Sequence, residues 1–479
     1  MEKRRKKVLL IDPPGFNGLK VGRVLGSFGT NKADQVWPPY DLQIMAGYCK
    51  KNNHGYKILD ANNLNLTYKE IKNEIEKYMP DWVVYLTCFQ TFKLDAKIAV
   101  VSKQVDKRIK TACISLSIFS VQNPAKQMEE LPDLDFIIWG EPELSLMELI
   151  NEKKPQKVRG VYYRNKGKIK FSGNAEKSKN LDEFGIPVHS CMNYKIYKCP
   201  MAIRLPMAVV SCSRGCINRC VHCQAGSFQR TIRYRSIENV IKELDELKSL
   251  GVKEIKFWDA SLLSSLEFTE KLCKKMIEKK YGFTWHCNAR AEFVNPKILD
   301  IMKKAGCHTV AIGCESSNAE ILKNMGKNET PEEIEKAVKL IKKHGMRVLI
   351  YMTFGLEGET EKTMKETYNF AKRLNPEFVT FGVVVPAPGT PFYDSLEKKG
   401  YLINKDLELQ DPNSLPAFSY PNLSPNKIHE FSRAAYRNYY FRPAYILMRL
   451  NKLRSLEELK ISFTNALSVV KRYCFEEVR

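Results

Sequence analysis

The chain has 479 residues, which is too long for one ordinary hydrophobic core, so two or three domains are expected. Hydrophobic residues make up 44% and charged residues 27%, a composition typical of globular rather than fibrous or disordered proteins. The 14 cysteines, spread over this length, indicate a reducing cytoplasm and argue against a disulfide scaffold. No secretory signal and no run of about 18 apolar residues is found, so no membrane-spanning helix is expected.

The formal net charge of +23 is high. It would suit nucleic acid, an anionic membrane surface or acidic small molecules as partners. It would equally suit lysines on solvated helix faces, such as those in residues 271–280, and this second interpretation is favoured.

Residues 1–150 are predicted to form a doubly wound, Rossmann-like α/β domain. Short and almost continuously apolar runs alternate with helical patterns such as 68–78. Such an alternation is typical of a parallel sheet that is covered on both faces. The predicted strands are 7–12, 56–60, 81–87, 110–115 and 135–140.

Ligands of doubly wound sheets bind beyond the carboxyl ends of the strands. The candidate ligand residues of this domain are therefore those that directly follow the predicted strands. They are Pro13, Pro14, Thr87, Thr91, Ser115, Ser117, Gly140 and Glu141.

Residues 151–204 are interpreted as a connector, with a hairpin at 159–171 around an Asn-Lys-Gly turn. Strand and helix signals then resume over residues 205–400. The predicted strands there are 208–211, 254–258, 284–288, 309–313, 347–352 and 378–383.

Three cysteines in the spacing C-x3-C-x2-C follow the first of these strands: Cys216, Cys220 and Cys223. Three thiolates in one loop can bind three irons of a [4Fe–4S] cluster and leave the fourth iron open. An open iron can bind an atom of a substrate or cofactor, which points to chemistry. A structural zinc site usually has four ligands, often from two separated pairs, and no second pair accompanies this triplet. Zinc and buried structural cysteines remain the alternatives.

Cys212 lies four residues before the triplet, at the end of the apolar run 207–211. As a fourth ligand it would close the cluster and leave no open iron. Free cysteine is often buried as a small hydrophobic residue, so a packed thiol at the strand end is the favoured interpretation.

The cysteine motif and its flanking segments resemble the radical S-adenosylmethionine superfamily. The matching segments are Ser-Arg-Gly-Cys216-x3-Cys220-x-His222-Cys223, Tyr234-Arg235-Ser236, the helical pattern 237–244 and Pro386-Ala-Pro-Gly-Thr-Pro391. The resemblance implies a partial β/α barrel over residues 205–400, with its active site at the carboxyl ends of the strands. It also implies that S-adenosylmethionine chelates the open iron and is cleaved to a 5′-deoxyadenosyl radical, which removes hydrogen from an inert carbon.

The same resemblance implies a set of residues for S-adenosylmethionine. His222 would line the adenine, and Asp259 would contact the methionine ammonium, which a carboxylate complements. Arg290 would pair with the cofactor's carboxylate, and Glu315 would accept the ribose hydroxyls. A glycine-rich turn that includes Gly355 and Glu357 would lie beneath the adenine, since small residues permit close backbone approach.

Some of these residues also have structural interpretations that involve no cofactor. His222 could be a surface residue of the cysteine loop, and Arg290 and Glu315 could form salt bridges at the barrel rim. The Gly-Gly that the family carries before its acidic residue is absent at Asp259. No catalytic residue is identified from the sequence.

Residues 1–150 resemble the cobalamin-binding domain that is joined to many enzymes of this superfamily. The matching pieces are Asp12-Pro-Pro, Trp37-Pro-Pro-Tyr, Ile58-Leu-Asp60-Ala and Gly140-Glu-Pro-Glu. The family's Asp-x-His-x2-Gly motif is absent, so no imidazole from that motif could bind the cobalt. Ser115-Leu-Ser stands where the family has Gly-Gly. A degenerate domain that only packs against its neighbour is the alternative.

Residues 401–479 are predicted to be a helical C-terminal region, and from about residue 425 it mixes aromatic residues with arginines. It resembles the Tyr-x-Arg-Pro tail of cobalamin-type members, some of which act on lipids and tetrapyrroles. Such a stretch can lie on a membrane, although more often it caps a core.

These features together predict a cobalamin-dependent radical S-adenosylmethionine enzyme, most simply a C-methyltransferase that uses methylcobalamin. A cyclase or another enzyme that forms C–C bonds is the first alternative. A tRNA methylthiotransferase is disfavoured, because the N-terminal cysteines do not supply a second cluster site, and nucleic acid is therefore not expected as a partner. A non-enzymatic iron–sulfur scaffold would not explain the cofactor-site pattern. The expected partners are a small-molecule or lipid substrate, an electron donor such as flavodoxin or ferredoxin, and a membrane surface contacted through the tail.

Overall fold

The computed structural model of the chain describes residues 4–16, 19–24, 27–30, 35–115, 118–410, 412–453 and 455–470. These residues fall into two compact units. The first comprises residues 1–31, 37–193 and 407–409, and the second comprises 32–36, 194–406 and 410–479. Among the described residues, no helix is both long and apolar enough to cross a bilayer.

The first unit is built on a seven-stranded sheet with the order β4-β1-β5-β6-β7-β8-β9. Its first five strands are parallel, and the hairpin β8–β9 extends the sheet in antiparallel fashion. The strands are β1 (Lys7–Asp12), β4 (Gly55–Asp60), β5 (Trp82–Leu86), β6 (Lys110–Ile114), β7 (Phe136–Ile138), β8 (Val161–Asn165) and β9 (Lys168–Phe171). The predicted hairpin is thus part of the sheet of the first unit.

Helices bury both faces of this sheet. Val8 and Leu10 of β1 pack in one apolar cluster with residues of α1 and α6, and Leu9 and Ile11, which point the other way, are fully buried as well. A capping box, in which Thr67 and Glu70 exchange hydrogen bonds, starts α2. The helices are α1 (Tyr40–Lys51), α2 (Tyr68–Tyr78), α3 (Phe92–Asp95), α4 (Lys97–Val105), α5 (Pro124–Glu130) and α6 (Pro142–Ile150).

A separate hairpin of β2 (Val21–Val24) and β3 (Ser27–Thr30) follows β1. The sequence analysis did not predict this hairpin. It brings Arg23 to the carboxyl edge of the main sheet, where the side chain is buried.

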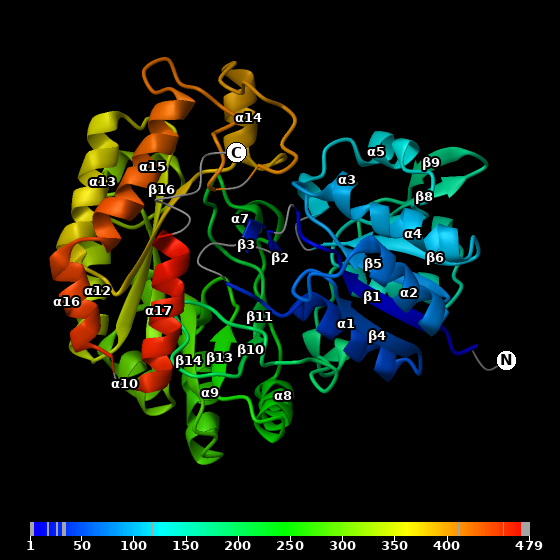
Figure 1. The fold of residues 1–479 in the computed structure, drawn as a ribbon, viewed down its shortest axis with the longest axis horizontal. Coiled ribbons are helices and arrows are strands. Elements are labelled where there is room, and N and C mark those ends of the chain that lie inside the picture. The colour runs from blue at the N-terminus through cyan, green and yellow to red at the C-terminus, as the bar shows by residue number, and fades with distance from the viewer. Residues whose placement is uncertain are drawn as a thin grey trace. The chain divides into compact units, whose positions relative to one another are not determined.

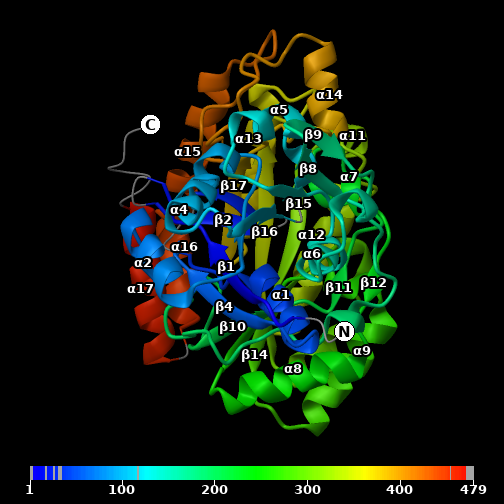
Figure 2. The same ribbon diagram turned by 90° about the vertical axis from the view of Figure 1, so that its right-hand side faces the viewer.

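The second unit contains a six-stranded parallel sheet with the sequential order β10-β13-β14-β15-β16-β17, which is a partial barrel. Figure 2 shows β15, β16 and β17 side by side. The strands are β10 (Met207–Val210), β13 (Glu254–Phe257), β14 (Thr284–Ala289), β15 (Cys307–Glu315), β16 (Arg347–Phe354) and β17 (Phe378–Val383). Each lies where the sequence predicts it, and the predicted α/β fold class is confirmed.

Helices follow the strands of this sheet, and α12, α13 and α15 pack against β16 and β17 (Figure 1). The helices are α7 (Gln224–Phe228), α8 (Ile237–Ser249), α9 (Leu266–Glu278), α10 (Pro296–Lys304), α11 (Ala319–Asn324), α12 (Pro331–Lys343), α13 (Glu361–Leu374), α14 (Pro391–Lys398), α15 (Pro425–Tyr440), α16 (Pro443–Asn451) and α17 (Leu456–Val470). A two-stranded ribbon pairs β11 (Ser213–Arg214) with β12 (Arg233–Tyr234).

Candidate active site

The three-cysteine loop leaves the carboxyl end of β10 and is closed at its base by the β11–β12 ribbon. The Arg235 N–H donates to the Cys212 carbonyl at 2.9 Å, and the Cys216 N–H donates to the Gln229 carbonyl at 2.8 Å. Gly215 adopts a positive φ of 103°, and a Cβ there would collide with the Thr231 carbonyl. The loop is therefore held in a fixed path at the end of a barrel strand, where active sites of such barrels lie.

The rest of the loop is fastened to its neighbours. The Val221 N–H donates to the Met325 carbonyl at 2.9 Å, and the Phe392 N–H donates to the Val221 carbonyl at 3.1 Å. Gly326, with a φ of 73°, packs so closely against the Arg219 carbonyl that a side chain would not fit.

Cys216, Cys220 and Cys223 are all half-buried on this loop. Burial raises the pKa of the Cys220 thiol to about 11 and also raises that of Cys223. The Asn218 amide donates to the Cys216 sulfur at 3.4 Å.

The spacing of the three cysteines suits a cluster, because a cubic iron–sulfur cluster binds each of three thiolates through a different iron. A structural zinc site usually has four protein ligands.

Cys212 is fully buried at the end of β10, as the packed-thiol interpretation expects. Burial raises the pKa of its thiol well above the ordinary value. Its N–H donates to the Asp259 carboxylate at 3.1 Å.

His222 lies on the cysteine loop with its Nδ1 atom buried and without a hydrogen-bond partner among the described residues. Burial, which disfavours the charged imidazole, lowers the pKa of His222. A buried polar atom without a partner is costly unless a ligand supplies one.

Asp259 follows β13 and is buried. Its carboxylate accepts hydrogen bonds from the Ser213 hydroxyl at 2.5 Å and from the Cys212 N–H. Burial raises the pKa of Asp259, and these hydrogen bonds oppose the shift. The structure thus connects Asp259 to the base of the cysteine loop.

Arg290 follows β14 and forms ion pairs with Glu292 at 2.6 Å and Glu329 at 3.4 Å. Lys327 is buried nearby, where it pairs with Glu329 at 3.2 Å and donates to the Gly313 carbonyl. The sequence pointed to Arg290 but offered no signal for Lys327 or Glu329.

Glu315 ends β15 with a positive φ of 64°, a backbone conformation that is strained for a residue with a side chain. Its carboxylate accepts a hydrogen bond from the Thr353 hydroxyl of β16 at 2.6 Å. Strain of this kind concentrates at ligand sites, and here it lies at the carboxyl edge of the barrel.

The glycine-rich turn after β16 has Gly355 at a φ of 84°, packed beneath the Phe418 ring. Glu357 of this turn pairs with Lys399 and accepts from the Ser395 hydroxyl at 2.9 Å, both on the α14 side. Glu359, which the sequence did not single out, is buried and accepts the Gly355 N–H at 2.6 Å.

In the first unit, the candidate ligand residues follow the parallel strands, whose order is that of flavodoxin-like sheets. Pro13 and Pro14 follow β1 and Thr87 follows β5, on either side of the point where the strand order reverses. Ligands of such sheets bind at this point. Thr91 caps α3, Ser115 follows β6, Glu141 caps α6 after Gly140, and Ser117 lies outside the described residues.

A buried ionic network occupies part of this edge. Arg23 pairs with Asp12 at 3.0 Å and with Asp95 at 2.7 Å, and it also donates to the Pro13 and Pro14 carbonyls. Beside it lies a small cavity of about 20 Å³ whose walls include Trp37.

His54 lies at the opposite, amino-terminal edge of the sheet, in the turn before β4. It is buried, and its Nδ1 accepts from the Lys6 N–H at 3.3 Å. It is therefore not part of the edge at which the candidate ligand residues lie.

Comparisons with known proteins agree with this arrangement. Residues 210–371 match the Radical SAM superfamily. An uncharacterized methyltransferase of Pyrococcus horikoshii is 29% identical over 448 residues, which cover 92% of this chain and 94% of that protein. An anaerobic magnesium-protoporphyrin IX monomethyl ester cyclase of Rubrivivax gelatinosus is 25% identical over 382 residues, which cover 76% and 67% of the two chains.

The fold is also similar to that of the cobalamin-dependent S-adenosylmethionine radical enzyme OxsB, solved with aqua-cobalamin and S-adenosylmethionine bound. The TM-score is 0.71 at 17% sequence identity, and the match covers 97% of this chain and 72% of that one. This likeness shows that the two chains share a fold.

Proposed function

The chain belongs to the radical S-adenosylmethionine superfamily, and on that premise we propose that it is a cobalamin-dependent C-methyltransferase of this superfamily. The observation that carries the proposal is the loop of Cys216, Cys220 and Cys223. Backbone hydrogen bonds hold this loop in a fixed path at the carboxyl end of β10.

The three thiolates would hold a [4Fe–4S] cluster with one open iron for S-adenosylmethionine. When bound, this pair of cofactors supplies a carbon-centred radical that can remove hydrogen from an inert carbon. The protein's own task is to position the cofactors and to exclude water. Cys212 stays outside the ligand set, because it is buried in the core at the strand end.

The proposed S-adenosylmethionine site combines residues from five strand ends. His222 offers a buried Nδ1 atom that needs a partner, and Glu315 offers a carboxylate at the barrel edge. Asp259 and Arg290 contribute charges at the ends of β13 and β14. Gly355 permits close approach of the backbone. Glu357 forms an ion pair with Lys399, so we assign it to the glycine-rich turn but not to direct contact with the cofactor.

The proposed cobalamin site is the carboxyl edge of the first sheet, near Pro13, Pro14, Thr87, Thr91 and Ser115, with Gly140 and Glu141 at the neighbouring strand. What supports it is the reversal of strand order between β1 and β5, which is where such sheets bind ligands. The motif that supplies a cobalt-binding histidine in other members is absent from this unit. His54 lies at the opposite, amino-terminal edge of the sheet. When bound, methylcobalamin would supply the methyl group.

Ring closure or other C–C bond formation is the second candidate. It is favoured by the similarity to the cyclase of R. gelatinosus over 382 residues. Both reactions would start from the same cluster and cofactor, so the substrate decides between them.

The partners belong to the same proposal. The substrate is a small molecule or a lipid, and an electron donor such as flavodoxin or ferredoxin reduces the cluster in the cytoplasm. Peripheral contact with an anionic membrane is proposed to involve α16 and α17.

The outer face of α17 supports a membrane contact. Its two acidic residues are engaged, since Glu458 pairs with Arg347 at 2.5 Å and Glu457 accepts the Leu205 N–H at 2.8 Å. Large apolar residues of the helix are exposed instead, at positions that share one face: Leu456, Leu459, Phe463 and Leu467.

Neighbouring α16, whose Arg449 donates a hydrogen bond to Ser462 of α17 at 3.2 Å, carries the exposed residues Ile446, Leu447 and Leu450. Lys460 of α17 is exposed, whereas Lys452 pairs with the buried Glu377. Exposed apolar residues with a nearby lysine suit the boundary between acyl chains and anionic headgroups.

The cofactor proposal is tested by anaerobic purification, cluster reconstitution and absorption spectra with and without added hydroxocobalamin. We expect a cluster that is lost in Cys220→Ala and kept in Cys212→Ala, and bound corrinoid that is unchanged in His54→Ala. A protein that forms its cluster but retains no corrinoid would leave the superfamily assignment intact and reject the cobalamin part.

A further inference from the structure

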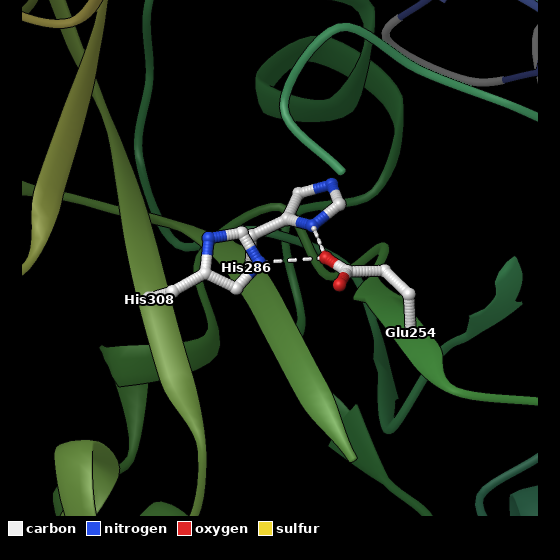
Figure 3. A group of neighbouring side chains, drawn as sticks. All are labelled: Glu254, His286 and His308. Atoms are coloured by element: carbon white, nitrogen blue, oxygen red, sulfur yellow. Dashed lines mark hydrogen bonds and ion pairs between the residues drawn. The ribbon is translucent and has the colours of Figure 1, made fainter. Parts of the chain in front are cut away.

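A second cluster of possible metal ligands lies at the end of the barrel opposite to the cysteine loop. Glu254 is the first residue of β13, His286 is the third of β14, and His308 is the second of β15 (Figure 3). All three are buried, and their binding atoms lie within 4.8 Å of one another. None of them takes part in the proposed cofactor site.

The two imidazoles converge on one carboxylate oxygen. The Oε1 atom of Glu254 lies 3.1 Å from His286 Nδ1 and 2.6 Å from His308 Nε2. Among the described residues, no lysine or arginine lies within ion-pair distance of Glu254, although the carboxylate is fully buried. A buried carboxylate is costly without a compensating positive charge, which a metal ion or a protonated imidazole can supply.

The remaining polar atoms of the three side chains have partners of their own. His286 Nε2 lies 3.6 Å from Cys199 Sγ, and His308 Nδ1 lies 2.7 Å from the Thr309 hydroxyl. The Thr284 hydroxyl donates to the second Glu254 oxygen at 2.5 Å. Outer partners of this kind fix the orientation of metal-binding histidines and carboxylates.

The backbone is adjusted at this place. Trp285 faces Cys307 across β14 and β15, but His286 faces Thr309, so His308 is an extra residue in β15. A bulge of this kind re-aims a side chain. Cys307 faces Trp285, so the next residue of each strand, His308 and His286, lies on the same side of the sheet.

We propose that Glu254, His286 and His308 bind one divalent metal ion of the zinc class. Two imidazole nitrogens and one carboxylate oxygen are zinc ligands, and water would take the fourth position. Bonds of about 2.0–2.1 Å require ligand atoms about 3.3 Å apart, so binding moves the Glu254 oxygen away from His308 by less than about 1 Å. The ion would clamp β13, β14 and β15 at their amino-terminal ends, where barrel residues serve stability.

The test is zinc content in the full-length protein with its iron cluster reconstituted. The protein is incubated with zinc sulfate, passed over a chelating resin and analysed for iron and zinc by mass spectrometry. We expect about one zinc per chain in the wild type and less than about a tenth of that in Glu254→Gln. The glutamine carbonyl can still accept hydrogen bonds from both imidazoles. Glu254→Gln therefore preserves the hydrogen bonds that the three side chains make when no metal is bound.

Two further variants test whether zinc binds at this site and not at the cysteine loop. Thr309→Val removes only the outer partner of His308 and should weaken zinc binding about 10- to 100-fold. In the triple variant Cys216→Ala, Cys220→Ala, Cys223→Ala, zinc should still bind, which would exclude the loop cysteines as its ligands. The wild-type Tm should rise with added zinc and that of Glu254→Gln should not. Equal zinc contents in wild type and Glu254→Gln, or none in the wild type, would overturn the proposal without affecting the cofactor assignment.

Discussion

The Ser213 hydroxyl donates a hydrogen bond to the Asp259 carboxylate at 2.5 Å, which joins the base of the cysteine loop to the end of β13. Asp259 also receives the Cys212 N–H, so one buried carboxylate orders the segment that leads into the loop. A group that fixes this segment also fixes the sulfurs that follow it.

Ser213→Ala should therefore lower the free energy of unfolding by about 1–3 kcal/mol, because a buried carboxylate loses a donor. It should also slow cluster reconstitution. Urea denaturation and iron content after a fixed reconstitution time measure the two effects. Ser249→Ala, at an exposed position on α8, is the matched control and should change neither. Equal behaviour of the two variants would show that the Ser213–Asp259 hydrogen bond does not support the loop.

Arg23 compensates two buried carboxylates at the edge of the first sheet. Arg23→Leu leaves Asp12 and Asp95 without their cation and should cost about 3–5 kcal/mol of stability. The comparison is Arg108→Leu, which breaks an exposed ion pair with Asp106 and should leave the free energy of unfolding almost unchanged. A loss below about 1 kcal/mol in Arg23→Leu would mean that the network contributes little.

The hairpin that carries Arg23 shows a limit of sequence reasoning. One of the two carboxylates that pair with the buried Arg23 is that of Asp95, 72 residues away in the chain. Nothing in the composition of residues 21–30 indicates that this partner exists. The main strands were predictable for the opposite reason, since a run such as 82–86 is buried on both faces and is apolar throughout.

The candidate site residues also differ in whether the sequence alone can reveal them. The three loop cysteines are local in sequence, so their spacing reveals them. Glu254, His286 and His308 come from three strands, and only the pairing of β13, β14 and β15 in one sheet brings them together. In the turn after β16, only the structure distinguishes Glu357, which pairs with Lys399, from the buried Glu359.

Glu359 predicts a pH dependence of stability. Burial raises the pKa of its carboxyl from 4.5 to about 8, against the hydrogen bonds from the Gly355 and Leu356 N–H groups. The folded protein thus holds this proton more tightly than the unfolded chain does. Its contribution to stability is fully present below pH 4.5 and is lost as the pH rises to about 8.

Glu359→Gln cannot ionise but can still accept the two N–H groups. Its stability relative to the wild type should therefore increase between pH 5 and about 8, by a few kcal/mol at most, and then level off. Urea denaturation at several pH values measures this difference. Glu332→Gln, at an exposed position on α12, serves as the control. A constant difference across this range would contradict the assignment of a raised pKa to Glu359.

The exposed face of α17 predicts membrane binding. Co-sedimentation with phosphatidylglycerol–phosphatidylcholine vesicles should be about tenfold weaker or more in the double variant Leu456→Ser, Phe463→Ser. Binding of the wild type should also weaken as salt is added. Ile277→Ser removes an exposed apolar residue of α9 and should leave binding unchanged. Wild-type protein that stays in the supernatant at low salt would reject the membrane contact.

The most direct measurement is the formation of 5′-deoxyadenosine from S-adenosylmethionine by the anaerobically reconstituted protein with a chemical reductant. We predict that the wild type and Cys212→Ala form it, whereas Cys216→Ala, Cys220→Ala and Cys223→Ala each lose at least about 99% of the activity, because an incomplete ligand set cannot hold the cluster. Continued formation of 5′-deoxyadenosine by a loop-cysteine variant, or its loss in Cys212→Ala alone, would contradict the assigned site.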